Sequence, residues 1–597
     1  MLPFEASRRL TGANLFFAGC GAQLETRGVS ADAALLAGWR ARIGRARAHL
    51  GWPAAGLVAR AHAGGTSLAL EAPLDQLFVA TEVNEWAWCA TVAAGDADLT
   101  RTLEQALLEE VLADAADPAA VIAPVLAEPA ALARLGTLAA REAQPGLCAL
   151  IAAAQRHRLP YVLDEEQLTL GSGAGGHGFA LGVLPAPAQV PWPQLHAVPT
   201  ALVTGSNGKT TTVRLLAACA RAHGWPSAFC CTDGVFFDSA AQLLGDYSGP
   251  EGARRVLRES RAQAAIIETA RGGILRRGLA VSNAQVAVVT NVSADHFGEY
   301  GIDDLAGLAD VKLTVAGVVD AAGLVVLNAE DAQLRARAPR LAERFARPVP
   351  LGWFALDADH PTLSAHRALG GASCGVRNGH LWLHHGGGEH DLGAIAAMPL
   401  TVEGSARYNV ANLAAAALAA AALGIPATVI AAVYARFGAA AEDNTGRLMR
   451  FERGGVRILV DYAHNPEGMR GLLQVARHLR GSTGRIGTLL GHAGNRQDSE
   501  IEALARATAE FHPELVVVKE NEAHLRGRAP GEVPRLMHAA LLRAGVPESA
   551  LPVRMSELEA VHCALEWARP GDVLALPVHS RDARQAVLAL LRSEPPA

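Results

Sequence analysis

One stretch of this sequence, residues 200–223, limits the fold more than any other. Residues 200–204 are apolar and β-branched and predict a buried strand, residues 205–208 predict a glycine turn, and Lys209 begins a predicted helix. Unpaired backbone N–H groups and the positive end of the helix dipole converge at such a turn and favour an anion. The lysine adds a charge for terminal phosphates, and the hydroxyl of Thr210 suits a magnesium ion. The predicted phosphate-binding residues are Gly205, Ser206, Asn207, Gly208, Lys209, Thr210 and Thr211.

The match to the phosphate-loop pattern is incomplete, because Val203 stands where that pattern has its first glycine. The alternative is a helix start with a capping turn and no ligand. A second glycine pattern at 171–176 has the GxGxxG spacing of dinucleotide sites, but a proline-rich tract follows it instead of a helix. We therefore predict a hairpin or loop there, followed by a semi-rigid linker.

Composition excludes several classes of function. A chain of 597 residues predicts two to four domains, and a net charge of −6 gives no electrostatic footprint for nucleic acid or a membrane surface. The alanine-rich run at 413–423 is too short to span a bilayer. The eight cysteines are scattered without a CxxC pair, and the N-terminus has no signal-peptide pattern, so we expect reduced thiols, no zinc or iron–sulfur site, and a cytoplasmic protein.

The rest of the chain predicts a repeated α/β pattern. Short apolar runs alternate with helical stretches, which indicates largely parallel sheets whose ligands collect at the carboxyl ends of the strands. The expected strands are 200–204, 264–268, 284–291 and 323–328, then 456–460, 486–490, 515–518 and 573–577. The first part of the chain predicts helices at 33–49, 74–94 and 120–141. The predicted domains are 1–195, 196–443 and 444–597.

Several motifs follow one another in a characteristic order. They are TGSNGKTT at 204–211, ETARGGILRRGL at 268–279, TNVSADH at 290–296, Lys312, YNVANLAAAALAA at 408–420, GRL at 446–448 and DYAHNP at 461–466. This set resembles the Mur ligase superfamily, whose members form amide bonds at the expense of ATP. The resemblance implies a three-domain α/β architecture, with a phosphate-loop central domain on a mostly parallel sheet and a Rossmann-like C-terminal α/β domain.

The sequence is most similar to the C-terminal, Mur-ligase-like half of the cyanophycin synthetase family. The stretches that carry this likeness are 268–276, 326–331, 491–498 and 519–528. That family has an ATP-grasp domain before the ligase half, whereas here the proline-rich tract leads directly into it. Some of its members also carry an HxxEH metal pattern, but residues 78–82 contain no histidine, so we expect no metal there.

The resemblance implies an ADP-forming ligase that uses ATP and Mg²⁺ to join an amino acid to a carboxylate through an acyl phosphate. It assigns catalytic or metal-binding roles to Lys209, Thr210, Glu268, His296 and Lys312, the last as a carbamate. It assigns further nucleotide contacts to Asn291, Asn409, Arg447, Asp461 and His464. For His296 the alternative is a packed histidine, for Lys312 a surface lysine, and for His464 a residue that only braces its own turn.

The amine donor is the least constrained part of this interpretation. The loop after the strand at 515–518 holds Glu520, Glu522 and Arg526, and an acidic cluster at this place would suit a guanidinium. One hypothesis is therefore a basic donor amino acid; the alternative is a solvated loop in which the two glutamates pair with Arg526 and Arg528. The competing function is a non-catalytic partner of a separate ATP-grasp protein. A homo-oligomer is left open.

Overall fold

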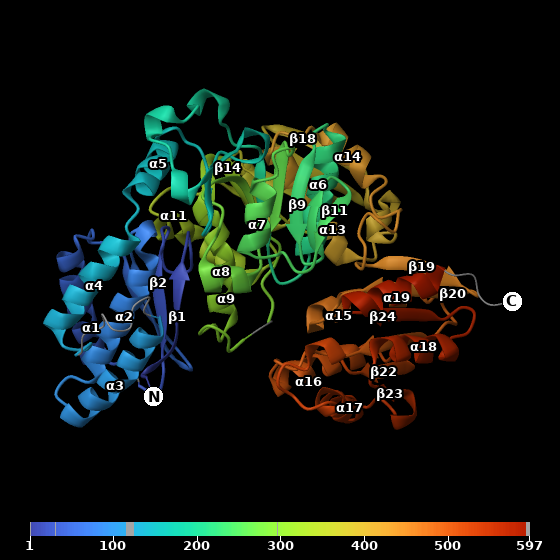
Figure 1. Cartoon of the computed structure of the whole chain (residues 1–597). Coiled ribbons are helices and arrows are strands. Elements are labelled where there is room, and N and C mark those ends of the chain that lie inside the picture. The colour runs from blue at the N-terminus through green and yellow to red at the C-terminus, as the bar shows by residue number, and fades with distance from the viewer. Residues whose placement is uncertain (1, 30, 115–123, 295–296, 593–597) are drawn as a thin grey trace.

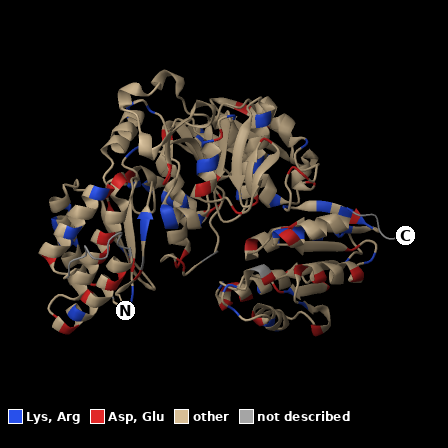
Figure 2. Cartoon of the chain, in the orientation of Figure 1, with Lys and Arg blue, Asp and Glu red and all other residues tan. Residues whose placement is uncertain are grey.

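The computed structural model describes residues 2–29, 31–114, 124–294 and 297–592. Figure 1 shows an N-terminal body at the lower left, a central body with the largest sheet, and a C-terminal body at the lower right. Acidic and basic residues are interspersed over all three in Figure 2, in keeping with the small net charge. None of the described helices is both long enough and apolar enough to cross a membrane.

The N-terminal body is an antiparallel sheet covered by helices. Its strands lie in the order β1–β2–β4–β3. The elements are β1 (Phe4–Leu10), β2 (Gly21–Thr26), α1 (Ala33–Leu50), β3 (Leu57–His62), β4 (Gly65–Glu71), α2 (Leu77–Val92), α3 (Ala97–Asp114) and α4 (Glu128–Glu142). Helix α2 is apolar on nearly all sides, which explains why it is buried between the sheet and the other helices. The helix predicted at 74–94 is thus a short 3₁₀ turn followed by α2, and the part of the predicted helix 120–141 before residue 124 lies outside the described residues.

A small unit connects this body to the centre. It consists of α5 (Pro145–Arg156), β5 (Tyr161–Leu163), β6 (Gln167–Leu170) and β7 (His177–Ala180), and the glycine-rich stretch joins β6 to β7 as a hairpin connection. The predicted hairpin or loop is confirmed there. The proline-rich tract forms short 3₁₀ turns, and the Trp192 ring stacks on His157 at 4.4 Å, so the tract is anchored to α5.

The central body is one large mixed sheet with helices on both faces. Eleven described strands lie in the order β11–β10–β9–β12–β8–β13–β14–β15–β16–β17–β18, parallel from β9 to β16 and antiparallel at both edges. The parallel strands are β9 (Ser227–Cys231), β12 (Ala264–Glu268), β8 (Thr200–Thr204), β13 (Ala284–Val289), β14 (Val319–Asn328), β15 (Leu351–Phe354) and β16 (Ala372–Arg377). The edge strands are β10 (Gly234–Phe237), β11 (Ala240–Leu244), β17 (His380–His385) and β18 (Gly388–Ala394).

An alanine-rich helix, α13 (Arg407–Ala422), packs closely on one face of this sheet. It packs on α6 (Lys209–Ala222) and on β13 to β17. Its run of alanines from 414 to 417 is fully buried, and such small side chains let a helix approach its neighbours closely. The predicted strand 284–291 ends two residues early at Val289, and 323–328 begins earlier at Val319.

The C-terminal body is a second parallel sheet. Its order is β19–β20–β24–β21–β22–β23, with only β19 antiparallel among the described strands. The strands are β19 (Met449–Arg453), β20 (Val456–Asp461), β21 (Ile486–Leu490), β22 (Leu515–Lys519), β23 (Val553–Arg554) and β24 (Val573–Pro577). The helices that cover it are α15 (Pro466–Leu479), α16 (Asp498–Ala509), α17 (Glu532–Arg543), α18 (Glu557–Trp567) and α19 (Arg581–Arg592). All four strands predicted from sequence in this region are present, and the mixed α/β fold class is confirmed.

Candidate functional site

The phosphate-loop candidate has the backbone that its sequence predicts. The loop leaves β8 at Gly205, where φ is +147°, and enters α6 after Gly208, where φ is +86°. A Cβ atom would lie 1.8 Å from Thr290 Oγ1 at the first glycine and 2.2 Å from Asn412 Oδ1 at the second. Both positions therefore require glycine for their conformation and for their close neighbours. Lys209 Nζ donates to the carbonyl oxygens of Gly205 (3.1 Å) and Ser206 (3.0 Å), so the ammonium lies over the loop.

Replacing Gly205 with alanine is expected to destabilise the fold and to weaken ATP binding, because the added methyl meets Thr290 and the backbone is already strained for any other residue. A loss of about 2 kcal/mol in the free energy of unfolding is expected from strain of this kind. The matched control is Gly224→Ala at the other end of α6, where φ is also positive (+92°) and nothing lies within 4 Å of a new Cβ. Thermal melting and calorimetry with ATP check this; equal ATP affinity in the two variants would contradict it.

Two neighbouring segments hold the loop in place. Asn291, which follows β13, accepts from the Asn207 N–H at 2.9 Å through its side chain and from the Ser206 N–H at 3.0 Å through its carbonyl. Thr290 Oγ1 donates to the Asn207 carbonyl at 2.5 Å. From the C-terminal body, Asn465 Nδ2 donates to Asn207 Oδ1 at 2.9 Å. Asn291, for which the sequence predicts a nucleotide contact, thus holds the loop in place and also lines the first of the cavities described below.

Glu268 is the buried carboxylate beside the loop. It ends β12, is 0% exposed, and accepts from Thr210 Oγ1 at 2.8 Å and from Thr232 Oγ1 at 2.9 Å. Carboxylate and hydroxyl oxygens are suitable ligands for Mg²⁺, so the Thr210–Glu268 pair fits that ion. Within the described ranges no group of three His, Cys, Asp or Glu side chains forms a metal cluster. Lys312 is 4% exposed at the end of α9 (Leu305–Lys312), and His296 lies outside the described residues.

Two cavities adjoin the loop. The first has a volume of about 550 Å³ and extends toward α13, and the second has a volume of about 630 Å³ and extends toward α8 (Arg271–Arg277) and Lys312. Residues that line both are Ser206, Lys209, Thr232, Glu268, Tyr462 and His464. The phosphate loop and its carboxylate therefore form part of the wall between the two cavities.

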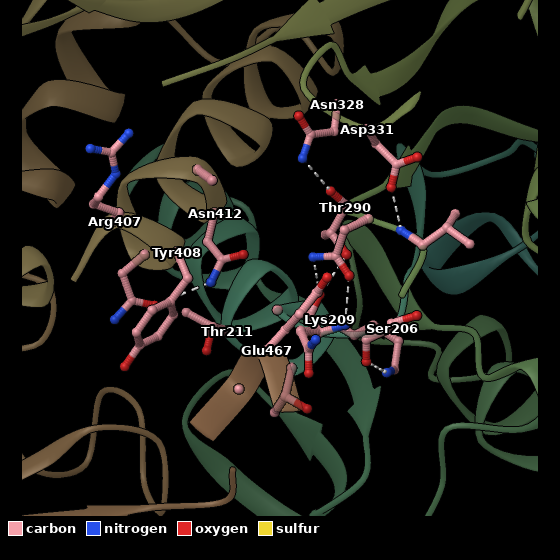
Figure 3. A pocket seen from close by; sticks show the side chains of 18 of the residues that line it. Ser206, Lys209, Thr211, Thr290, Asn328, Asp331, Arg407, Tyr408, Asn412 and Glu467 are labelled. Carbon is pink, nitrogen blue, oxygen red and sulfur yellow. Dashed lines mark hydrogen bonds between the residues drawn. The ribbon is translucent and has the colours of Figure 1, made fainter. Parts of the chain in front are cut away.

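Figure 3 shows how the first cavity is built. Arg407, Tyr408 and Asn412 reach it from α13, and Asn328 and Asp331 reach it from the end of β14 on the opposite side. Asn328 Nδ2 donates to the Thr290 carbonyl at 3.0 Å, and Asp331 Oδ2 accepts from the Val292 N–H at 2.6 Å. Asn409 also lines this cavity, but its amide donates to the Leu400 carbonyl at 3.0 Å and its oxygen accepts from Asn412 at 3.1 Å.

Arg447 and Asp461 reach the loop from the C-terminal body. The Arg447 guanidinium lies 4.1 Å over the Tyr462 ring, and its Nη2 is 3.4 Å from Thr210 Oγ1. Burial alone would lower the pKa of Arg447, but the charges of Asp233 and Asp461 outweigh it and raise that pKa, so the cation persists. Burial raises the pKa of Asp461, which Arg447 only partly offsets, and its Oδ2 accepts from the Leu448 N–H at 2.7 Å.

Sequence reasoning missed the contacts that hold the two bodies together around this site. Asp233 accepts from Arg214 at 2.9 Å and from Arg584 at 2.8 Å, which joins the central body to α19. Arg214 also donates to the Thr445 carbonyl at 2.9 Å. Asp233 and Arg584 belong to no recognised motif, and 351 residues separate them, so no local pattern could have paired them.

The loop after β22 differs from the expectation. Glu520 is 3% exposed, and its two oxygens accept from the backbone N–H groups of Gly531 (2.8 Å) and Asn521 (3.1 Å). Glu522 is exposed, and neither glutamate is among the described residues that line the two cavities, whereas Arg526 lines the second. The alternative interpretation paired the two glutamates with Arg526 and Arg528. Arg528 instead forms ion pairs with Asp498 and Glu532.

The N-terminal body contacts a segment that lines the second cavity. Arg60 Nη1 donates to the Gly301 carbonyl at 2.5 Å, and the Ala63 N–H donates to Asp303 at 2.7 Å. The Arg8 guanidinium lies 4.6 Å from the ring centre of Tyr300, which is a lining residue. In Figure 1 this body accordingly lies beside α8 and α9.

Comparisons with known proteins agree with this architecture. Two family models match consecutive parts of the chain: "Mur ligase middle domain" at residues 203–420 and "Mur ligase, glutamate ligase domain" at residues 446–576. The cyanophycin synthetase of Synechocystis sp. is 34% identical over 381 residues, which are 64% of this chain and 42% of that protein. The chain therefore spans less than half the length of the cyanophycin synthetases it matches.

Peptidoglycan enzymes and solved structures are similar at lower identity. The UDP-N-acetylmuramoyl-L-alanyl-D-glutamate–2,6-diaminopimelate ligase of Xanthomonas campestris pv. campestris is 28% identical and covers 70% of this chain and 86% of its own length. The structure of E. coli FolC in complex with DHPP and ADP has a TM-score of 0.49 at 18% identity, covering 66% of this chain and 89% of that one. Residues 203–420 of this chain are thus a Mur ligase middle domain, and residues 446–576 are a Mur ligase C-terminal domain.

Proposed function

We propose that this protein is an ATP-dependent, ADP-forming ligase that joins an amino acid to a carboxylate by an amide bond. The observation that carries the proposal is the wall shared by the two cavities, which contains both Lys209 and Glu268. A nucleotide in the first cavity would present its terminal phosphate at this wall, and an acceptor carboxylate in the second would meet it there. A phosphoryl group passing between them needs cations and rigid positioning at that point.

The reaction has two steps, and the chain's residues have a role in each. A carboxylate oxygen attacks the γ-phosphorus, the bond to the β–γ bridging oxygen breaks, and ADP leaves. The amine nitrogen then attacks the acyl carbon, gives up its proton, and inorganic phosphate departs as the amide forms. Lys209 and the backbone N–H groups of 208–210, at the start of α6, stabilise the negative charge on the phosphates during the first step. A magnesium ion held by Thr210 and Glu268 would further neutralise the charge of the β- and γ-oxygens.

Contacts between the central and C-terminal bodies protect the intermediate. An acyl phosphate hydrolyses in water, so the site must exclude water while it exists. The Asn465–Asn207 and Arg447–Thr210 contacts bring the C-terminal body against the loop. Asp461 and His464, which lie in the same stretch of chain as Asn465, line the first cavity. Opening and closing of these contacts would admit substrates and release ADP.

The amine donor is proposed to be an amino acid, and the ADP-release assay described below tests whether it is basic, neutral or acidic. The hypothesis of a basic donor depended on an acidic loop, and the carboxylate of Glu520 is instead occupied by backbone N–H groups. Arginine and lysine are both included in the assay, because the resemblance of the sequence to the cyanophycin synthetase family suggested a basic donor. Replacing Glu520 with glutamine is thus expected to affect stability more than the KM for any amino acid.

ADP release is the direct test of the proposed function. Purified protein is incubated with ATP, Mg²⁺, a panel of amino acids and acidic acceptors, and ADP and phosphate are measured against the Lys209→Ala variant. ADP formation that requires both an amine and a carboxylate supports the ligase. If ADP never exceeds the variant's background in any combination, the ligase proposal fails and the non-catalytic partner role replaces it.

Lys312 provides a separate prediction. A carbamate there, formed when CO₂ adds to the neutral amine with loss of a proton, would give an anionic oxygen ligand in the cavity that Glu268 also lines. Protein equilibrated with [¹³C]bicarbonate is expected to give one carbamate NMR signal that is lost in Lys312→Arg and kept in Lys209→Ala. A spectrum without that signal, or one that Lys312→Arg retains, would contradict carbamylation of this lysine.

A further inference from the structure

Lysine is very rare in this chain. Lysine and arginine together number 53, yet lysine occurs only at 209, 312 and 519. Arginine supplies the cation everywhere else, so a lysine marks a place where a compact ammonium is needed and a planar guanidinium is unsuitable. Lys209 and Lys312 both line the second cavity. Lys519 has no role in the reaction described above, although it lies just behind the same cavity.

Lys519 is completely buried at the end of β22. Its Nζ contacts Glu557 Oε1 and lies 3.3 Å from His579 Nδ1, and both the lysine and glutamate side chains are 0% exposed. Glu557 is the first residue of α18 and also accepts from the backbone N–H groups of His579 (2.9 Å) and Ser580 (2.7 Å). Space for the lysine exists because position 491 is glycine: a Cβ there would lie 2.8 Å from Lys519 Cγ.

The contacts of His579 define its tautomer. An ammonium can only donate, so Nδ1 must carry a lone pair toward Lys519, and the proton must be on Nε2. Nε2 lies 2.9 Å from the Ala463 carbonyl, which can only accept, so both neighbours require the same form. Burial and the Lys519 charge lower the pKa of His579 to about 3, which keeps the ring neutral at physiological pH. His579 therefore bridges Lys519 and Ala463 as a neutral ring.

Ala463 belongs to the turn that enters both cavities. The turn follows β20 and carries Tyr462 and His464, which line both cavities, while the Tyr462 ring supports Arg447. His579 contacts this turn twice, through the Ala463 carbonyl and through an edge-to-face contact with the Tyr462 ring at 5.3 Å. The buried cluster therefore ties the ends of β20, β24 and β22 to one position of the turn, although β21 separates β24 from β22 in the sheet.

We propose that Lys519, Glu557 and His579 form a positioning cluster that fixes the turn 461–464 against the shared wall of the two cavities. His579 also lines the second cavity, and the cluster acts through its contacts with Ala463 and Tyr462. This inference rests on the proposed ligase function only for its kinetic consequence. Its structural consequence, a rigid turn, can be measured without turnover.

Substitutions at His579 distinguish positioning from proton transfer. Glutamine keeps a donor for Ala463 and an acceptor for Lys519, whereas leucine has neither. His579→Gln is expected to stay within about 5-fold of wild-type kcat/KM, and His579→Leu to lose about 100-fold, the loss typical of a reacting group displaced by an ångström. Equal loss in both variants would overturn the proposal, because glutamine can replace a hydrogen bond but not a titrating imidazole.

Substitutions at the ion pair separate positioning from simple stability. Lys519→Met alone leaves a buried carboxylate unpaired and is expected to unfold much of the protein, so Lys519→Met/Glu557→Gln removes both charges. The matched control is Asp572→Asn, which breaks an ion pair with Arg485 at the opposite end of β21 and β24. Both variants are expected to melt at lower temperature than wild type. Only the double variant is expected to lose kcat/KM in the folded protein.

Hydrogen exchange provides the readout that needs no reaction. Amides of 461–465 are expected to exchange at least about 10-fold faster in His579→Leu and in the double variant, and at the wild-type rate in Asp572→Asn, because local opening is governed by local contacts. Unchanged exchange in both cluster variants would sink the positioning role whatever the kinetics show. A wild-type protein without ligase activity but with the expected exchange pattern would reject the proposed function and leave this inference standing.

Discussion

Replacing Lys209 with alanine is expected to lower kcat/KM for ATP by about 10³-fold, near 4 kcal/mol of transition-state stabilisation. The reason is that the Lys209 ammonium lies over the phosphate loop at the wall shared by both cavities. Within the described part of the chain its side chain donates to two loop carbonyls, so alanine should leave the fold intact. Steady-state ADP release and calorimetry with ATP measure the effect.

The control for this variant is Arg221→Ala, which removes one positive charge from the exposed last turn of the same helix. It is expected to match wild type in both assays, because an exposed charge far from the loop is screened by solvent and salt. Wild-type ATP affinity in Lys209→Ala would remove the nucleotide from this loop. Loss of affinity in both variants would instead indicate a nonspecific charge effect.

Replacing Glu268 with glutamine is the second large effect, with an expected fall in kcat of about 100-fold, comparable to removal of one transition-state-stabilising group. The amide keeps the shape of the side chain, and the hydroxyls of Thr210 and Thr232 can rotate to suit it. What is lost is the anionic ligand for magnesium. The concentration of Mg²⁺ that gives half-maximal activity is therefore expected to rise.

Thr232→Val separates the charge of Glu268 from its hydrogen bonds. It removes one donor to the carboxylate and leaves the charge in place, so its Mg²⁺ dependence should stay close to that of wild type. Activity measured across a magnesium titration, together with melting temperatures, checks both variants. A Glu268→Gln enzyme with the wild-type magnesium curve would show that this carboxylate does not bind the ion.

The sequence alone determined the local part of this protein. Gly205, Gly208 and Lys209 form the predicted strand–turn–helix backbone, because a strand, a turn with positive φ and a helix start each have a short-range requirement that a few residues can meet. The parallel strands β8, β12, β13 and β14 were predicted for the same reason, since each contains a continuous apolar run, whereas β9, β15 and β16 were not predicted. The edge strands β10, β11, β17 and β18 were not predicted, because their sequences alternate weakly and mix in glycine and charge.

Only the tertiary structure decided which residues meet. The shared wall unites Glu268 with Tyr462 and His464, almost two hundred residues apart, and no pattern in the sequence encodes that distance. The fate of charged groups was equally non-local: Glu520 is occupied by the N–H of Gly531, and Lys519 finds its carboxylate at Glu557, 38 residues away. A buried charge needs a partner, but the fold alone determines which residue fills that role, because desolvation acts on three-dimensional neighbours and not on sequence neighbours.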